Sequence, residues 1–84
     1  MMKREVEIRL ENGLEARPIA LLVQVASQYE SSIYIESEGK RVNAKSIMGM
    51  MTLVLSAGDK VVVSADGKDE EAALDGIETY LCGK

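Results

Sequence analysis

The chain has 84 residues and a formal net charge of −4, from ten basic and fourteen acidic side chains. This length suits one small domain over residues 1–84 and leaves little room for a deep enzyme cleft. Because histidine is absent, imidazole acid–base catalysis, histidine metal ligands and phosphohistidine transfer are excluded. The basic residues do not cluster, so we expect no direct contact with nucleic acid.

Cysteine content and hydropathy indicate the cellular compartment in which the protein is expected. The single cysteine, Cys82, excludes an internal disulfide framework and fits a reducing cytoplasm. No apolar run approaches the roughly 20 residues of a membrane span, and the first residues lack a signal-peptide core. We therefore expect a cytoplasmic protein that works by contact with partners, not an enzyme, and that needs no cofactor.

The first half of the chain predicts a strand, a helix and a hairpin. Residues 6–10 alternate between apolar and polar, which indicates a strand buried on one face. Helical spacing of apolar residues from Ala16 predicts a helix to about residue 29 or 30, with Pro18 in its first turn. Residues 33–36 and a short strand around Val42 form a hairpin, because residues 37–40 are typical of a turn.

The second half predicts two helices around one strand. A short helix extends from residue 47 to about 53, with Ser46 as its N-cap and Gly49 weakening it. After a turn at residues 57–59, residues 61–65 are rich in β-branched side chains, which predicts a strand. Asp69 is expected to cap the last helix and Gly83 to end it. Its predicted inward face consists of Ala73, Leu74, Ile77 and Leu81.

The predicted order is β-α-β-β-α-β-α, and the half-polar strands favour a largely antiparallel sheet with helices on one face, an α+β fold. Near the last helix, an acidic run superficially suggests a cation site. Because the run lacks the spacing of a calcium loop and lies where a helix begins, a solvated helix start is the better interpretation. The run consists of Asp66, Asp69, Glu70 and Glu71.

Two segments place functional-looking groups at helix starts. In the first, residues 13–18, Glu15 stands where backbone N–H groups attract anions, and the residues alone favour a simple cap. In the second, residues 42–51, Ser46 precedes apolar residues that cover nearly every direction of a short helix. Exposed Met and Ile beside a polar serine are typical of an adaptable partner-binding patch. These apolar residues are Ile47, Met48, Met50 and Met51.

The first helix has a second stripe at helical spacing, away from its main apolar face. Leu21 is the large apolar residue in this stripe, and periodicity alone favours a broad core face as its explanation. The stripe consists of Arg17, Ala20, Leu21 and Gln24.

At these two segments the chain resembles the HPr family, the phosphocarriers of the bacterial sugar phosphotransferase system. The resemblance spans nearly the whole chain and rests on residues 13–18, 42–49 and 67–74. It implies an open-faced β-sandwich of HPr type, a four-stranded antiparallel sheet with three helices on one face. Where the family has its phosphorylated histidine, in the motif G-L-H-A-R-P, this chain has Glu15. A carboxylate there would form only a reactive acyl phosphate, so we expect no phosphocarrier activity.

The pattern is similar to the catabolite-repression HPr-like paralogues, called Crh, which keep the serine site and have glutamine in place of the histidine. This resemblance implies that HPr kinase/phosphorylase phosphorylates Ser46, and that the product is a corepressor of catabolite control protein A, a LacI-type repressor. The added negative charge would act beside the apolar patch, with Arg17 and Lys45 as local cations. The expected partner-binding residues are Arg17, Ala20, Leu21, Gln24, Lys45, Ile47, Met48 and Met51.

Two alternatives remain at this point. The chain is an HPr phosphocarrier that diverged or was altered at Glu15, or it is a paralogue that regulates a metabolic enzyme independently of Ser46. The N-terminal strand is a plausible exchange element, so both a monomer and a strand-swapped dimer are expected forms.

Overall fold

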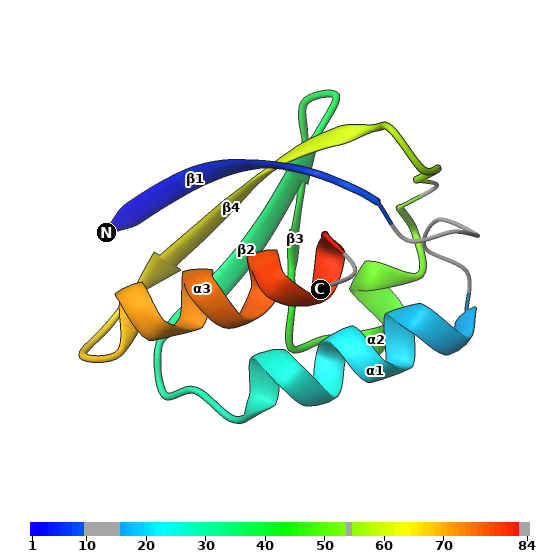
Figure 1. Cartoon of the computed structure of the whole chain (residues 1–84). Helices are drawn as coiled ribbons and strands as arrows, with labels where there is room; N and C mark the ends of the chain where they lie inside the picture. The colour runs from blue at the N-terminus through cyan, green and yellow to red at the C-terminus, as the bar shows by residue number, and fades with distance from the viewer. Residues whose placement is uncertain (10–15, 54, 83–84) are drawn as a thin grey trace.

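The computed structural model describes residues 1–9, 16–53 and 55–82, except for the side chains of residues 16 and 17. It contains seven elements in the predicted order (Figure 1). They are β1 (Met2–Glu7), α1 (Ala16–Ser27), β2 (Ser32–Ser37), β3 (Lys40–Asn43), α2 (Ile47–Met50), β4 (Lys60–Asp66) and α3 (Glu70–Leu81).

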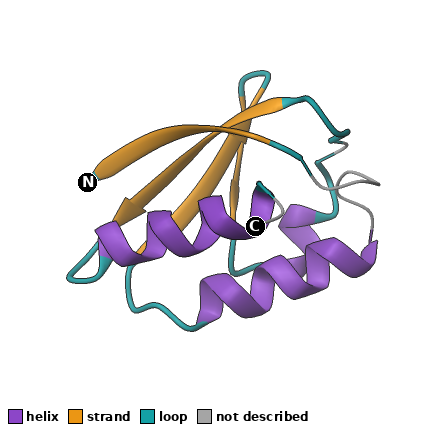
Figure 2. Ribbon diagram, in the orientation of Figure 1, coloured by secondary structure: helices purple, strands orange, loops and turns teal. Residues whose placement is uncertain are grey.

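The four strands form one antiparallel sheet in the order β1-β4-β2-β3. All three helices lie on the same side of this sheet (Figure 2). The predicted α+β fold, with an antiparallel sheet covered on one face, is confirmed. None of the helices in the described part of the chain is long and apolar enough to cross a lipid bilayer.

The core lies between the sheet and the helices, and its pattern follows from the two-residue period of the strands. The register places Ile33 beside Ala65 and Ile35 beside Val63, and all four side chains are buried. From the helix side, α3 contributes the face predicted for it, and α1 contributes three further buried residues. These helical core residues are Ala73, Leu74, Ile77 and Leu81 of α3, and Ile19, Leu22 and Ala26 of α1.

The first strand begins earlier than the alternating pattern indicated. It runs from Met2 to Glu7, because β4 is long enough to pair with it from Met2 opposite Ala65 to Glu7 opposite Lys60. Ile8 follows the strand, is fully buried, and donates its N–H to the Asp59 carbonyl at 2.8 Å. The predicted end at residue 10 lies outside the described residues.

Two helices end earlier than predicted, and both end in a tighter turn. After α1, the N–H groups of Gln28 and Tyr29 bond to carbonyls three residues back, not four. After α2, Thr52 and Leu53 do the same. The α-helical geometry of α2 therefore stops at Met50, three residues short of the predicted boundary. The predicted stop of α3 at residue 83 lies outside the described residues.

Asp69 occupies the N-cap position of α3, but its side chain makes no capping hydrogen bond, so that prediction was wrong. Its carboxylate instead accepts the N–H groups of Glu30 and Ser31, both at 2.9 Å, and the Ser31 hydroxyl. The turn before α3 approaches this segment closely enough that a Cβ at Gly67 would lie 2.7 Å from the Ser31 main chain. Asp69 therefore joins the start of α3 to the segment between α1 and β2.

Candidate phosphorylation and partner-binding site

Ser46 is the N-cap of α2, as predicted. Its backbone is extended, with φ −106° and ψ 111°, and its Oγ accepts the Gly49 N–H at 3.2 Å. The Ser46 N–H donates to the Asn43 carbonyl at 3.0 Å, and the Ser46 carbonyl accepts the Met50 N–H at 2.9 Å. The main chain of Ser46 is therefore held on both sides, and its hydroxyl by one bond, at the point where β3 passes into α2.

The loop before Ser46 is held by two further contacts. The Asn43 side-chain oxygen accepts the Lys45 N–H at 2.8 Å, which closes a tight turn. The Lys45 ammonium donates to the Tyr29 carbonyl at 2.6 Å, beyond the end of α1. A role for Lys45 beside a phosphate stays a prediction, and it would require the ammonium to leave or share this carbonyl. Nothing in the local sequence signals a partner 16 residues away.

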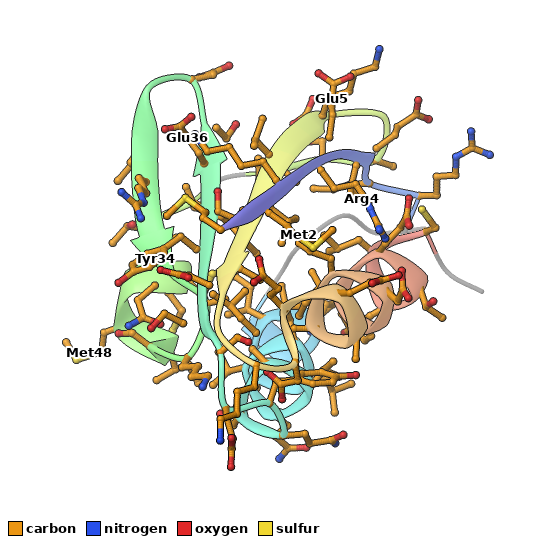
Figure 3. The ribbon with its side chains drawn as sticks, turned by 90° about the vertical axis from the view of Figure 1, so that its left-hand side faces the viewer. Met2, Arg4, Glu5, Tyr34, Glu36 and Met48 are labelled. Atoms are coloured by element: carbon orange, nitrogen blue, oxygen red, sulfur yellow. The ribbon has the colours of Figure 1, made fainter. Side chains whose placement is uncertain are left out.

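The side chains of α2 and of its C-cap, Met51, divide between the core and solvent, because only one of the four turns inward. Met50 is fully buried, whereas Ile47 is 46% exposed, Met48 80% and Met51 55%. Figure 3 shows Met48 protruding at the periphery of the molecule, away from the sheet. The predicted exposure of apolar side chains beside Ser46 is therefore confirmed.

α1 lies against α2 and adds another exposed apolar side chain (Figure 1). Leu21 is 46% exposed, so the interpretation of its stripe as part of a broad core face was wrong. Gln24 is also exposed, and Ala20 is half-buried. The large apolar side chains that α1, α2 and the C-cap of α2 leave in solvent are called the exposed apolar residues below. They are Leu21, Ile47, Met48 and Met51.

Two predicted site residues are not tested by this geometry. Glu15 lies outside the described residues, and Arg17 belongs to α1 but its side chain is not described. The hydroxyl of Ser46 has no carboxylate partner among the described hydrogen bonds.

Three residues of the acidic run at the start of α3 make structural contacts. The N-terminal amino group lies 3.7 Å from an Asp66 oxygen and 3.4 Å from a Glu70 oxygen. Hydrogen bonds from the Ser31 hydroxyl and the Glu30 N–H hold the pKa of Asp69 below its ordinary value, because they favour the charged form. Within the described residues no group of three side chains is arranged to hold a metal ion.

Two other titratable groups lie away from Ser46. Burial raises the pKa of Tyr80, whose hydroxyl donates to the Pro18 carbonyl at 2.8 Å and so joins α3 to the start of α1. Cys82 is half-buried, with its sulfur 3.8 Å from the Glu7 carbonyl oxygen. Both groups therefore support the packing of α3.

Comparison with known proteins agrees with this architecture. The family model described as the phosphotransferase-system (PTS) HPr component phosphorylation site matches residues 2–82. The HPr-like protein Crh of Bacillus subtilis is 48% identical over 81 residues, which are 96% of this chain and 95% of that protein.

Solved structures show the same fold. The phosphocarrier protein HPr from Bacillus anthracis matches with a TM-score of 0.92 at 44% identity, over 95% of each chain. A structure of the Bacillus subtilis catabolite-repression protein Crh, described as a dimer with a swapping domain, matches with a TM-score of 0.80 at 46% identity. That match covers 100% of this chain and 97% of that one.

Proposed function

The chain belongs to the HPr family, and from that premise we propose that it is a regulatory, non-enzymatic HPr-like protein of carbon catabolite repression. The observation that carries this proposal is the juxtaposition of the Ser46 hydroxyl with the exposed apolar residues of α1 and α2. The similarity to Crh of Bacillus subtilis supports the regulatory class.

In this proposal HPr kinase/phosphorylase phosphorylates Ser46 with ATP as donor. The bond from Ser46 Oγ to the γ-phosphorus forms while the bond from that phosphorus to the bridging oxygen breaks. ADP leaves with the electron pair, and the hydroxyl proton passes to a base of the kinase. The product carries about −1.5 to −2 additional charge at neutral pH. Because Ser46 is already held by backbone bonds, we expect little refolding.

The phosphorylated chain then binds catabolite control protein A as its corepressor. A phosphate is a strong acceptor for basic residues of a partner, and the exposed apolar residues supply area that can be buried. A standard interface takes about 800 Å² from each partner, roughly a sixth of the 4980 Å² that this chain exposes. The kinase and the repressor would therefore compete for the same region around Ser46.

Glu15 argues against phosphocarrier activity. A carboxylate in the position of the family's histidine would repel an incoming phosphoryl donor and would form only a labile acyl phosphate. Enzyme I with phosphoenolpyruvate should therefore leave the chain unlabelled. A stable label on Glu15 would favour the second candidate, a phosphotransferase-system carrier, which the similarity to HPr from Bacillus anthracis supports.

In this proposal the protein acts in the cytoplasm, either as a monomer or as a dimer that exchanges β1. β1 is an edge strand, paired on one side with β4. The dimer described for Crh of Bacillus subtilis supports the exchanged form.

The deciding experiment is incubation with HPr kinase/phosphorylase and ATP, followed by mass spectrometry of the intact chain and its peptides. The proposal expects one phosphate, on Ser46. Ser46→Ala should remain unmodified, whereas Ser56→Ala, which alters an exposed serine before β4, should be modified like the parent. Absence of phosphate from the parent chain, or equal labelling of Ser46→Ala, would overturn the proposal.

A further inference from the structure

Most of the described glycines are required by the fold itself. Gly39 and Gly58 have positive φ angles of 78° and 93°, a backbone conformation that side chains disfavour. A Cβ at Gly67 or at Gly76 would overlap neighbouring atoms. At each of these positions, a larger residue would strain the unmodified chain.

Gly49 is the exception among the glycines that the structure describes. It lies inside α2 and does not have a positive φ. A Cβ there would lie 3.4 Å from Ser46 Oγ, 3.6 Å from Ser46 Cβ and 3.8 Å from Val42 Cβ, all ordinary van der Waals distances. Because alanine also favours helical backbone more than glycine does, the unmodified chain would accept alanine at position 49. Neither backbone nor packing therefore explains this glycine.

We propose that Gly49 determines whether the site can accept phosphorylation, because it keeps the space beside Ser46 Oγ open for a phosphoryl group. In phosphoserine the phosphorus is one bond from Oγ and its oxygens are two bonds away. A methyl group 3.4 Å from Oγ would therefore crowd those oxygens on that side. The buried Val42 side chain, 3.8 Å from the same methyl position, limits how far the methyl could withdraw.

This inference rests on the proposed phosphorylation of Ser46, and it adds the residue that makes the site tolerant of the modification. The Gly49 N–H faces the same space, since it donates to Ser46 Oγ at 3.2 Å. A substitution at position 49 therefore acts on the modified state while leaving the unmodified hydrogen bond in place.

The test uses four full-length chains, the parent and Gly49→Ala, each with serine or with genetically encoded phosphoserine at position 46. Encoded phosphoserine needs no kinase, so this test remains valid if the kinase does not accept the parent chain. Unmodified Gly49→Ala should melt at or above the melting temperature of the parent. Phosphoserine should lower the melting temperature of Gly49→Ala by roughly 5 °C or more beyond its effect in the parent.

Met51→Ala, prepared in the same two forms, is the matched control, because it alters an exposed side chain and adds no atom beside Ser46. Its response to phosphoserine should equal that of the parent. An equal shift in the parent and in Gly49→Ala would overturn the inference. In a second measurement, kcat/KM of HPr kinase/phosphorylase for Gly49→Ala should fall at least tenfold. An unchanged value would also overturn the inference, whereas failure to modify the parent would count against the proposed function alone.

Discussion

The Lys45 ammonium donates to the Tyr29 carbonyl oxygen at 2.6 Å and so joins the loop before Ser46 to the segment that follows α1. The next two residues of that segment, Glu30 and Ser31, are bound by the Asp69 carboxylate at the start of α3. The position of Ser46 therefore depends on a series of polar contacts that reaches across the helical layer.

Lys45→Met keeps the length and most of the volume of the side chain but removes this donor. A hydrogen bond from a charged group contributes about 1.5–3 kcal/mol, so the melting temperature should fall by roughly 6 °C or more. Thermal unfolding followed by circular dichroism measures the change. Lys68→Met, at an exposed lysine in the turn before α3, should leave the melting temperature within about 2 °C of the parent. Equal effects of the two substitutions would contradict this role of Lys45.

The pH dependence of stability in Asp69→Asn tests the contact that the Asp69 carboxylate makes at the start of α3. The pKa of Asp69 in the folded chain lies below 3.8, its ordinary value, because the Ser31 hydroxyl and the Glu30 N–H favour the carboxylate. Its stabilisation is therefore present above the unfolded pKa and is lost as the pH falls through the lower folded pKa. Melting temperatures from pH 7 to pH 2 should show Asp69→Asn less stable at pH 7, with the difference from the parent narrowing below about pH 3.8.

Glu71→Gln is the control for this experiment, because it removes an exposed acidic charge from the first turn of the same helix. Its difference from the parent should be small at every pH. A difference between Asp69→Asn and the parent that stayed constant down to pH 2 would show that the carboxylate is not the stabilising form.

Substitutions at Met48 and Met50 distinguish effects on binding from effects on stability. The methionine side chain is 80% exposed at position 48 and fully buried at position 50. Met50→Ala should destabilise the chain by about 2–5 kcal/mol, because it leaves a cavity in the core. Met48→Ala should change stability by less than about 0.5 kcal/mol. In the proposed function, Met48→Ala should also weaken binding of the phosphorylated chain to the repressor about tenfold. Calorimetric titration measures the affinity, and unchanged binding would remove Met48 from the interface.

Arg4 joins β1 to α3 through ion pairs with Asp75 at 2.7 Å and Glu78 at 2.9 Å. Because Arg4 is 29% exposed, the pairs are partly screened, and Arg4→Met should lower stability by about 0.5–1 kcal/mol, less in high salt. Arg9→Met, which removes a more exposed pair with Glu7, should have no measurable effect. Thermal unfolding at low and high salt distinguishes these outcomes, and a salt-independent loss in Arg4→Met would exclude the ionic explanation.

Sequence patterns predicted the parts of this fold that depend on local periodicity. Three such features depend only on residues close in sequence. They are the inward face of α3, the strand around Val63 and the N-cap at Ser46. The hairpin was predictable for the same reason, because residues 37–40 are typical of a turn. In the structure, residues 38 and 39 have the positive φ that this two-residue turn requires.

The remaining features depend on residues far apart in the chain. The side chain of Asp69 has the chemistry of a cap, but Glu30 and Ser31 bind it from 39 and 38 residues away. The exposure of Leu21 depends on where α2 lies against α1, which helical spacing alone does not fix. The length of β1 was likewise set by its partner β4, and not by its own alternation.

The most direct test measures how tightly catabolite control protein A binds this chain with and without a phosphate on Ser46, by calorimetric titration of both forms. We expect the phosphorylated chain to bind at least a hundredfold more tightly, a difference of about 2.7 kcal/mol. The unmodified chain should behave like Ser46→Ala. Equal affinity of the two forms would contradict the account, because the phosphate would then add nothing to the surface that the repressor recognises.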